Sequence, residues 1–68
     1  MTFAQEASLN ALAKLGFNVN RNDGKTIYMS KRIKYSTYYA EFDADGYVNG
    51  LPLKDFIADF KARKLLRK

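Results

Sequence analysis

The chain has 68 residues with no histidine, cysteine or tryptophan, and 12 lysine and arginine residues against 7 acidic ones. Without histidine or cysteine, the usual general base near neutral pH, the thiolate nucleophile and the imidazole or thiolate metal ligands are all missing. We therefore expect a binding module and no enzyme, with no cofactor, no metal and no small-molecule substrate. The formal net charge of +5 points to an anionic partner, either nucleic acid or an acidic protein surface.

The composition predicts one small folded domain over residues 1–68. Hydrophobic residues make up 47% of the chain and aromatic residues 15%, which is more than disordered chains contain. The N-terminal residues lack the apolar run of a signal peptide, and no stretch approaches the roughly 20 apolar residues of a membrane span. Together with the absence of cysteine, this favours a cytoplasmic protein that makes no membrane contact.

The first predicted element is a helix over about residues 3–15. Thr2 and Gln5 have the spacing of a capping box, and alanines and leucines follow them as helix formers with an apolar stripe. Gly16 suits the left-handed position that ends a helix. Phe17 can then fold back on Leu12, as in a Schellman motif.

The residues after this corner alternate with a period of two, which predicts a first strand over residues 17–22. In a regular strand, Val19 and Arg21 lie on the same side of the sheet. Asp23 and Gly24 then have the residue types of a type I′ hairpin turn.

Two further strands are predicted, over residues 25–30 and 35–42. The second of them is rich in tyrosine and other residues with high β propensity. We expect the basic segment 30–34 between them to form a turn, although it could also continue the strand before it. The sequence Asp-Ala-Asp-Gly at residues 43–46 predicts a loop, and residues 47–48 can pair as a short fourth strand.

The last predicted element is a helix that begins just after Pro52, because apolar residues follow it at helical spacing. The fold class is therefore α+β, with a helix, three or four antiparallel strands and a second helix, and with both helices on one face of the sheet. We expect one core formed by Leu12, Leu15, Phe17, Phe56, Ile57 and Phe60.

Charge is separated along the chain. Residues 25–40 carry basic and no acidic side chains, residues 41–59 are mostly acidic, and residues 60–68 are again basic. Such blocks give a folded domain a dipole whose direction depends on packing. The basic segment 61–68 also suits the C-terminal end of a helix, and terminal segments of this kind commonly fray.

Basic residues and tyrosines are mixed between residues 25 and 39, and this combination is typical of surfaces that hold phosphates and stack bases. The same residue types also occur in ordinary strands, where tyrosine has high β propensity and lysine protects sheet edges. The predicted binding residues are Lys25, Tyr28, Lys31, Arg32, Lys34, Tyr35 and Tyr39, with Lys61, Arg63, Lys64, Arg67 and Lys68 from the C-terminal segment.

The predicted element order, with Leu15-Gly16-Phe17 at the corner after the first helix, resembles the double-stranded-RNA-binding fold. It is also similar to the small HicA-type toxin ribonucleases built on that fold. Those toxins use a strand histidine, which this chain lacks, so the resemblance implies no ribonuclease activity. The lysine cluster expected at the start of the last helix of an RNA-binding domain is replaced by residues 51–55, Leu-Pro-Leu-Lys-Asp.

Two functions fit these features. The first is a non-enzymatic module that contacts nucleic acid through its basic, tyrosine-rich strands and its basic C-terminal helix end. The alternative is a small protein-interaction factor, such as a phage-type inhibitor that docks on a host enzyme or nucleoprotein complex. Small size, tyrosines and separated charge are compatible with this alternative too, because tyrosines anchor interfaces and separated charge steers association.

Overall fold

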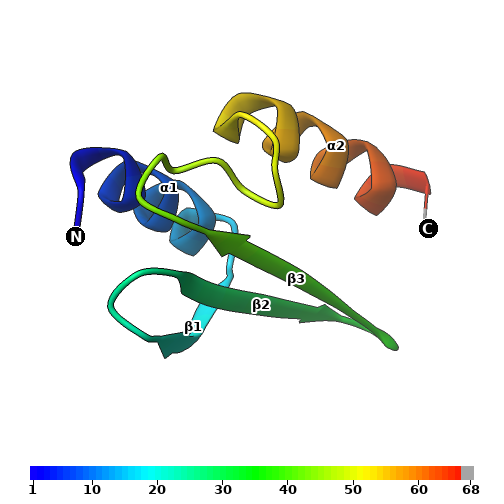
Figure 1. Ribbon diagram of the computed structural model, residues 1–68. Helices are drawn as coiled ribbons and strands as arrows, with labels where there is room; N and C mark the ends of the chain where they lie inside the picture. The colour runs from blue at the N-terminus through cyan, green and yellow to red at the C-terminus, as the bar shows by residue number, and fades with distance from the viewer. Residues whose placement is uncertain (67–68) are drawn as a thin grey trace.

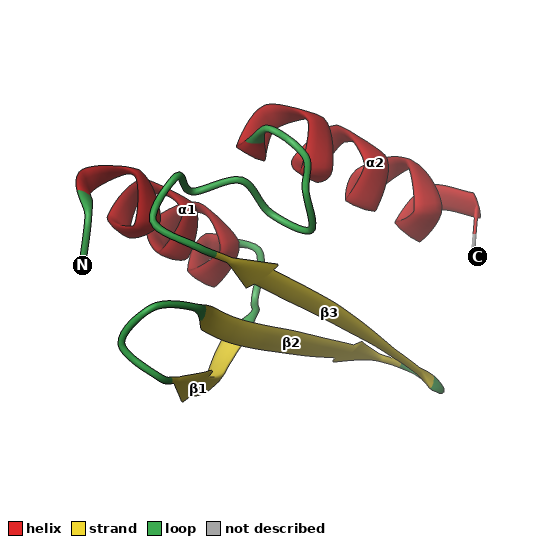
Figure 2. Cartoon of the chain, in the orientation of Figure 1, coloured by secondary structure: helices red, strands yellow, loops and turns green. Residues whose placement is uncertain are grey.

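A computed structural model describes the backbone of residues 1–66 and the side chains of residues 1–63. The elements are α1 (Phe3–Lys14), β1 (Asn18–Asn22), β2 (Ile27–Ile33), β3 (Ser36–Phe42) and α2 (Leu53–Leu66). The strands form one antiparallel sheet in the order β1-β2-β3, and both helices lie on the same side of it (Figures 1 and 2). The predicted α+β class and element order are confirmed. Over the part of the chain that the structure describes, neither helix has the length and apolar character needed to cross a membrane.

Both ends of α1 form as the sequence predicts. The backbone amide of Gln5 donates to Thr2 Oγ1 at 3.1 Å, and the amide of Thr2 donates to Gln5 Oε1 at 3.0 Å, which completes the capping box. After the helix, Gly16 has a φ of 98°. The amide of Phe17 then donates to the carbonyl of Leu12 at 3.0 Å, the long-range bond of a Schellman motif.

The loop between β1 and β2 differs from the predicted type I′ turn. Strand pairing resumes only at Ile27, which leaves a four-residue loop over 23–26. Asp23 Oδ1 accepts hydrogen bonds from the backbone amides of Thr26 at 2.8 Å and of Lys25 at 3.0 Å. These bonds lower the pKa of the Asp23 carboxyl, and the bond from Thr26 has the larger effect. Because this side chain closes the turn, Asp23 itself does not need a positive φ.

The expected turn over residues 30–34 is also wrong, because β2 continues through it. Pairing between β2 and β3 runs without a break from Ile27 opposite Phe42 to Ile33 opposite Ser36. The turn is therefore only residues 34–35, and Lys34 adopts a left-handed φ of 54°. The polar residues before Ile33 favour a turn by their residue type. Ile33 is partly buried against the core, however, and this burial favours the longer strand.

No fourth strand forms at residues 47–48, where Val48 makes only isolated bridges. Instead, the side chain of Asn49 pairs with the outer edge of β3. Its Nδ2 donates to the carbonyl of Tyr39 at 3.0 Å, and its Oδ1 accepts the amide of Glu41 at 2.9 Å. A carboxamide carries the same donor and acceptor as a peptide group, so Asn49 takes the place of a pairing strand.

The core lies between the helices and one face of the sheet. Phe17 is at its centre, with ring centroids 5.2 Å from Phe60 and 6.2 Å from Phe56 in edge-to-face contact. The buried apolar residues are Leu12, Phe17, Ile27, Met29, Ala40, Phe42, Val48, Phe56 and Phe60. The predicted core is confirmed, with Leu15 and Ile57 packed against it in partly buried positions.

Candidate nucleic-acid interface

We call the side of the sheet that points away from both helices the open face. It is formed by Asn20 and Arg21 of β1, Tyr28, Ser30 and Arg32 of β2, and Thr37, Tyr39 and Glu41 of β3. The β2 residues alternate with Ile27 and Met29, which are buried on the helix side. Neither α1 nor α2 packs on this side of the sheet (Figure 1).

A bulge in β1 directs Arg21 toward the open face. Val19 pairs with Met29 on the helix side, but Arg21 pairs with Tyr28 on the opposite side, so the alternation reverses at Asn20. The Arg21 guanidinium carbon lies 5.7 Å from the centre of the Tyr28 ring, a cation–π distance. The expectation that Arg21 shares a side with Val19 is therefore wrong, because the extra residue turns the strand.

Asn20 and Ser30 form a hydrogen-bonded pair in the middle of the open face. Asn20 Nδ2 donates to Ser30 Oγ at 2.8 Å, and the Ser30 hydroxyl donates to Asn20 Oδ1 at 3.1 Å. Tyr39 is the cross-strand neighbour of Ser30 and is 68% exposed. An exposed aromatic ring therefore lies next to the half-buried Ser30, which on its other side holds the amide of the exposed Asn20.

Several of the predicted binding residues come together at this face and its end. Tyr28, Arg32 and Tyr39 lie on the open face, and the turn beyond it consists of Lys34 and Tyr35, whose side chain is 97% exposed. These residues belong to two neighbouring strands and the turn that joins them. The structure therefore brings these five predicted residues together on one surface.

Lys31 does not belong to this group, because it points to the helix side of β2. Its ammonium donates to the carbonyl of Leu15 at the end of α1. A cation at this position satisfies a free helix carbonyl and interacts favourably with the helix dipole. The structure thus separates Lys31 from Arg32 and Lys34 and gives it a role in holding α1 on the sheet.

The remaining described basic residues of the predicted site lie apart from the open face. Lys61 and Arg63 are exposed on α2, and Arg63 Nε contacts Asp59 Oδ2 at 3.0 Å. Lys25 is in the loop between β1 and β2, at the opposite end of the sheet from Lys34. The side chain of Lys64 and all of Arg67 and Lys68, which were also predicted, lie outside the described residues.

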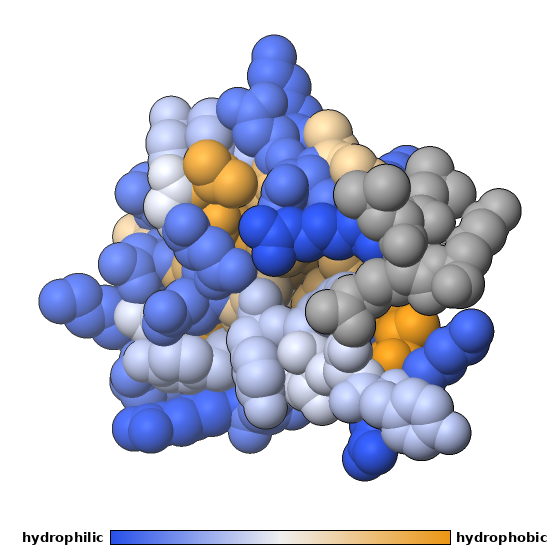
Figure 3. Space-filling view, turned by 90° about the vertical axis from the view of Figure 1, so that its right-hand side faces the viewer, coloured by the Kyte–Doolittle hydropathy of each residue, from blue (hydrophilic) through white to orange (hydrophobic). Residues whose placement is uncertain are grey.

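The β2–β3 turn and the C-terminal part of α2 lie at the same end of the molecule (Figure 1). The ring of Tyr38 packs edge-on against that of Phe60 at 5.3 Å and joins β3 to α2 near this end. We call this region the basic end, and it is formed by Arg32, Lys34, Lys61 and Arg63. Figure 3 looks onto it and shows hydrophilic residues over much of the visible surface.

Acidic side chains gather at the other end. The N-terminus of α1 is tied to the neighbouring loops by bonds from Gln5 Nε2 to the carbonyl of Lys25 and from Thr2 Oγ1 to that of Ala44, at 3.1 and 2.7 Å. We call this region the acidic end, and it is formed by Glu6, Asp23, Asp43 and Asp45. Lys25 also lies at this end, and Asp59 pairs with Arg63 at the other, so the two ends differ in their prevailing charge without following the charge blocks of the sequence.

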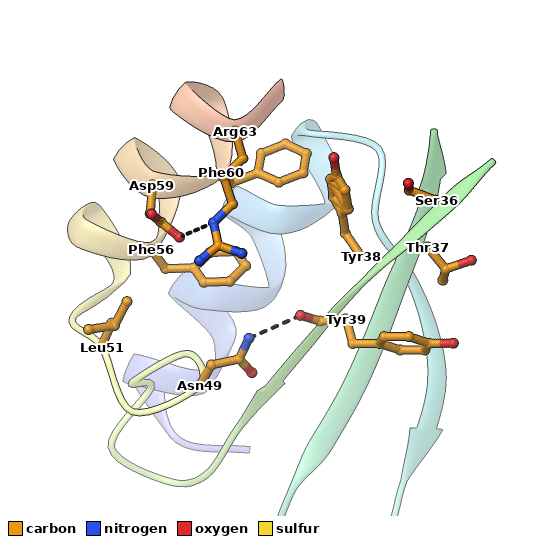
Figure 4. Close-up of a pocket in the computed structure, with 10 residues that line it drawn as sticks. All are labelled: Ser36, Thr37, Tyr38, Tyr39, Asn49, Leu51, Phe56, Asp59, Phe60 and Arg63. Carbon is orange, nitrogen blue, oxygen red and sulfur yellow. Dashed lines mark hydrogen bonds and ion pairs between the residues drawn. The ribbon is translucent and has the colours of Figure 1, made fainter. Parts of the chain in front are cut away.

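A groove of about 910 Å³ lies between β3 and α2 (Figure 4). The strand side contributes Thr37 and Tyr39, and Phe56 and Arg63 line the helix side. The Tyr39 ring points out of the groove, so mainly its backbone faces α2 (Figure 4). The groove and the open face thus lie on different sides of β3.

Comparisons of the chain with protein-family models, with curated proteins and with solved structures find no match. The resemblance in element order to the RNA-binding fold therefore gains no support from them. Asn20, Arg21 and Ser30 were not among the predicted site residues. If β2 is taken as one continuous strand, Ser30 alternates onto the same face as Tyr28 and Arg32, so the sequence could have predicted its place in the site. The positions of Asn20 and Arg21 depend on the bulge in β1, which leaves no clear mark in the sequence.

Proposed function

We propose that this protein is a non-enzymatic nucleic-acid-binding module that contacts its ligand through the open face and the basic end. The observation that carries the proposal is the exposed ring of Tyr39 on the sheet face that neither helix covers, with Arg32 on the neighbouring strand. Sheets that present aromatic rings beside cations bind bases by stacking and phosphates by charge. Lys34 and Tyr35 extend the same surface at the turn.

The proposal is tested by titrating the protein against labelled oligonucleotides at low and at physiological salt. Stacking depends on the aromatic ring, so Tyr39→Phe should bind almost as the wild type does. Tyr39→Ala should bind more weakly by about 5- to 150-fold, which corresponds to roughly 1 to 3 kcal/mol per stacked base. Tyr47→Ala is the matched control, because Tyr47 is 49% exposed and belongs to the loop between β3 and α2, which runs on the helix side of the sheet (Figure 1).

Binding that Tyr39→Ala weakens and Tyr47→Ala leaves unchanged would support the open face as the site. Equal affinity for all three variants and the wild type would move the site elsewhere. Absence of detectable binding to any oligonucleotide at low salt would contradict the proposal as a whole.

A second candidate function is protein interaction, and the groove between β3 and α2 favours it. The groove combines an apolar ring, Phe56, with charged Arg63 and with the edge of β3. A captured partner that remains bound after nuclease treatment, and that is lost on Leu51→Asp at the groove wall, would support this candidate. Loss of the partner on nuclease treatment would instead support nucleic-acid binding.

A further inference from the structure

We infer that the open face binds a single strand of nucleic acid and reads one of its bases. That base stacks on Tyr39, and its edge forms hydrogen bonds with the Asn20–Ser30 pair. The inference rests on the proposed function and narrows it to one class of ligand and one set of contacts. Three features of the open face support it.

The first feature is the spacing of the aromatic rings. Tyr28 and Tyr39 lie on adjacent strands as diagonal neighbours, because Tyr28 is opposite Glu41 and Tyr39 is opposite Ser30. The backbones of diagonal neighbours are about 7 to 8 Å apart, whereas bases along one strand of a duplex rise by about 3.4 Å and cover each other's faces. Only an unstacked single strand can place a base on such a ring.

The shape of the open face adds to this first feature and also favours a single strand over a duplex. The major groove of DNA admits a helix or a two-stranded ribbon, whereas the open face spans three strands. Its cations are also few, with Arg21 engaged over Tyr28 and Arg32 in the next row toward the turn. A duplex held by its phosphates alone would need more cations on this face than it presents.

The second feature is the fixed position of the Asn20–Ser30 pair. The bulge in β1 and two side-chain hydrogen bonds hold the Asn20 amide against Ser30, which is the cross-strand neighbour of Tyr39. Each hydrogen bond uses only part of the capacity of the amide, which keeps a second N–H and further oxygen lone pairs. An adjacent donor and acceptor of this kind can recognise the edge of a base, as asparagine does with adenine.

The third feature is the path open to the backbone of the strand. Arg32 is one row beyond Ser30 on β2, and Lys34 follows at the turn. A strand whose base lies on Tyr39 can therefore place the next phosphates near Arg32 and Lys34. This path leads from the base-reading position to the basic end.

The experiment compares short homopolymers of the four bases with a duplex of the same length, at one salt concentration. The wild type should bind its preferred homopolymer at least about tenfold more tightly than the duplex, because the duplex offers no free base face. It should also distinguish the best from the worst homopolymer by about fivefold or more, the value of one hydrogen bond. Asn20→Ala should reduce that difference to within about twofold.

Controls separate base reading from folding. Asn20→Asp keeps the size of the side chain but replaces a donor with an acceptor, so it should change which homopolymer is preferred. Asn10→Ala, at an exposed position on α1, should leave both affinity and preference unchanged. Circular dichroism and thermal melting establish that each variant is folded before its binding is compared.

The outcomes distinguish this inference from the proposed function. Equal affinity for duplex and single strands would overturn the single-strand inference and leave nucleic-acid binding in place. A wild type without base preference, or a preference that persists in folded Asn20→Ala, would overturn the base-reading contact. Failure to bind any oligonucleotide would overturn both the inference and the proposed function.

Discussion

Two lysines three positions apart, Lys31 and Lys34, have different roles in this structure. Lys31 points to the helix side and donates to the carbonyl of Leu15, whereas Lys34 is exposed at the turn. Lys31→Met keeps the length of the side chain but removes the donor and the charge. We expect it to lower the free energy of unfolding by about 1 kcal/mol, measured by urea denaturation, and to leave oligonucleotide affinity unchanged.

Lys34→Met is the matched variant, with the opposite expected result. It should weaken oligonucleotide binding and change the free energy of unfolding by less than about 0.5 kcal/mol, as exposed substitutions usually do. If Lys31→Met weakens binding as much as Lys34→Met does, Lys31 belongs to the binding surface after all.

Two glycines with similar backbone conformations provide a second comparison. Gly24 and Gly46 have φ values of 89° and 76°. A Cβ at Gly46 would lie 2.7 Å from the backbone oxygen of Ala4, whereas at Gly24 it would meet nothing within 4 Å. Gly24→Ala should therefore cost about 1 kcal/mol for its backbone conformation, and Gly46→Ala about 3 kcal/mol or more because α1 must also move.

Thermal melting of the two glycine variants tests this difference. Similar melting temperatures would mean that α1 adjusts without cost and that the contact between the loop at Gly46 and the helix is loose. The buried bond from Ser8 Oγ to the carbonyl of Gly46, 2.6 Å long, indicates a close contact instead.

The side chain of Asn49 forms two of the hydrogen bonds along the outer edge of β3, where its backbone amide also donates to the carbonyl of Glu41 at 2.9 Å. Asn49→Gly keeps the left-handed backbone available, since Asn49 has a φ of 52°, and keeps the backbone bond to Glu41, but removes both side-chain bonds to the strand. We expect a loss of about 1 to 2 kcal/mol in the free energy of unfolding. Asn49→Ala should cost more, because alanine also disfavours the backbone conformation.

Hydrogen exchange of the Glu41 amide provides a local measurement of the same effect. In the wild type this amide donates to Asn49 Oδ1, so its protection should fall in both variants. Unchanged protection at Glu41 would show that another group pairs with the edge of β3.

The helices were predictable because their signals are local. The capping box of Thr2 and Gln5 and the Schellman corner at Gly16 each act within a few residues, and both form as expected. The aromatic stripe of α2 likewise predicts burial of Phe56 and Phe60 in the core. These features do not depend on which strand pairs with which.

The strand errors come from interactions between distant residues. The length of β2 depends on its pairing with β3, and the side on which Arg21 lies depends on a bulge in β1. The predicted strand ended at Ser30, so no side of the sheet could be predicted for Lys31. In the structure β2 continues, and Lys31 lies on the helix side. Composition alone could therefore propose binding residues, but which of them share one face depends on the register of the sheet.

The separation of basic and acidic side chains at the two ends of the molecule affects the direction from which an anionic ligand approaches. The basic and acidic ends lie at opposite ends of a molecule with principal extents of 35, 21 and 18 Å. A field of this kind orients an anionic ligand during its approach and raises the association rate at low salt. The ligand should therefore meet the basic end first and extend from there onto the open face.

The dependence of affinity on salt measures how many phosphates are held at this end. For a single strand, the slope of log K against log salt is about −0.7 for each phosphate neutralised. The double variant Arg32→Ala with Lys34→Ala should therefore make the slope shallower by about 1.4 if each side chain holds one phosphate. Glu6→Gln, at the acidic end, should leave the slope unchanged while raising affinity slightly, because it removes a distant repulsion without adding a phosphate contact. An unchanged slope in the double variant would mean that the phosphates are held elsewhere, and the exposed cations of α2, Lys61 and Arg63, would then be the next to test.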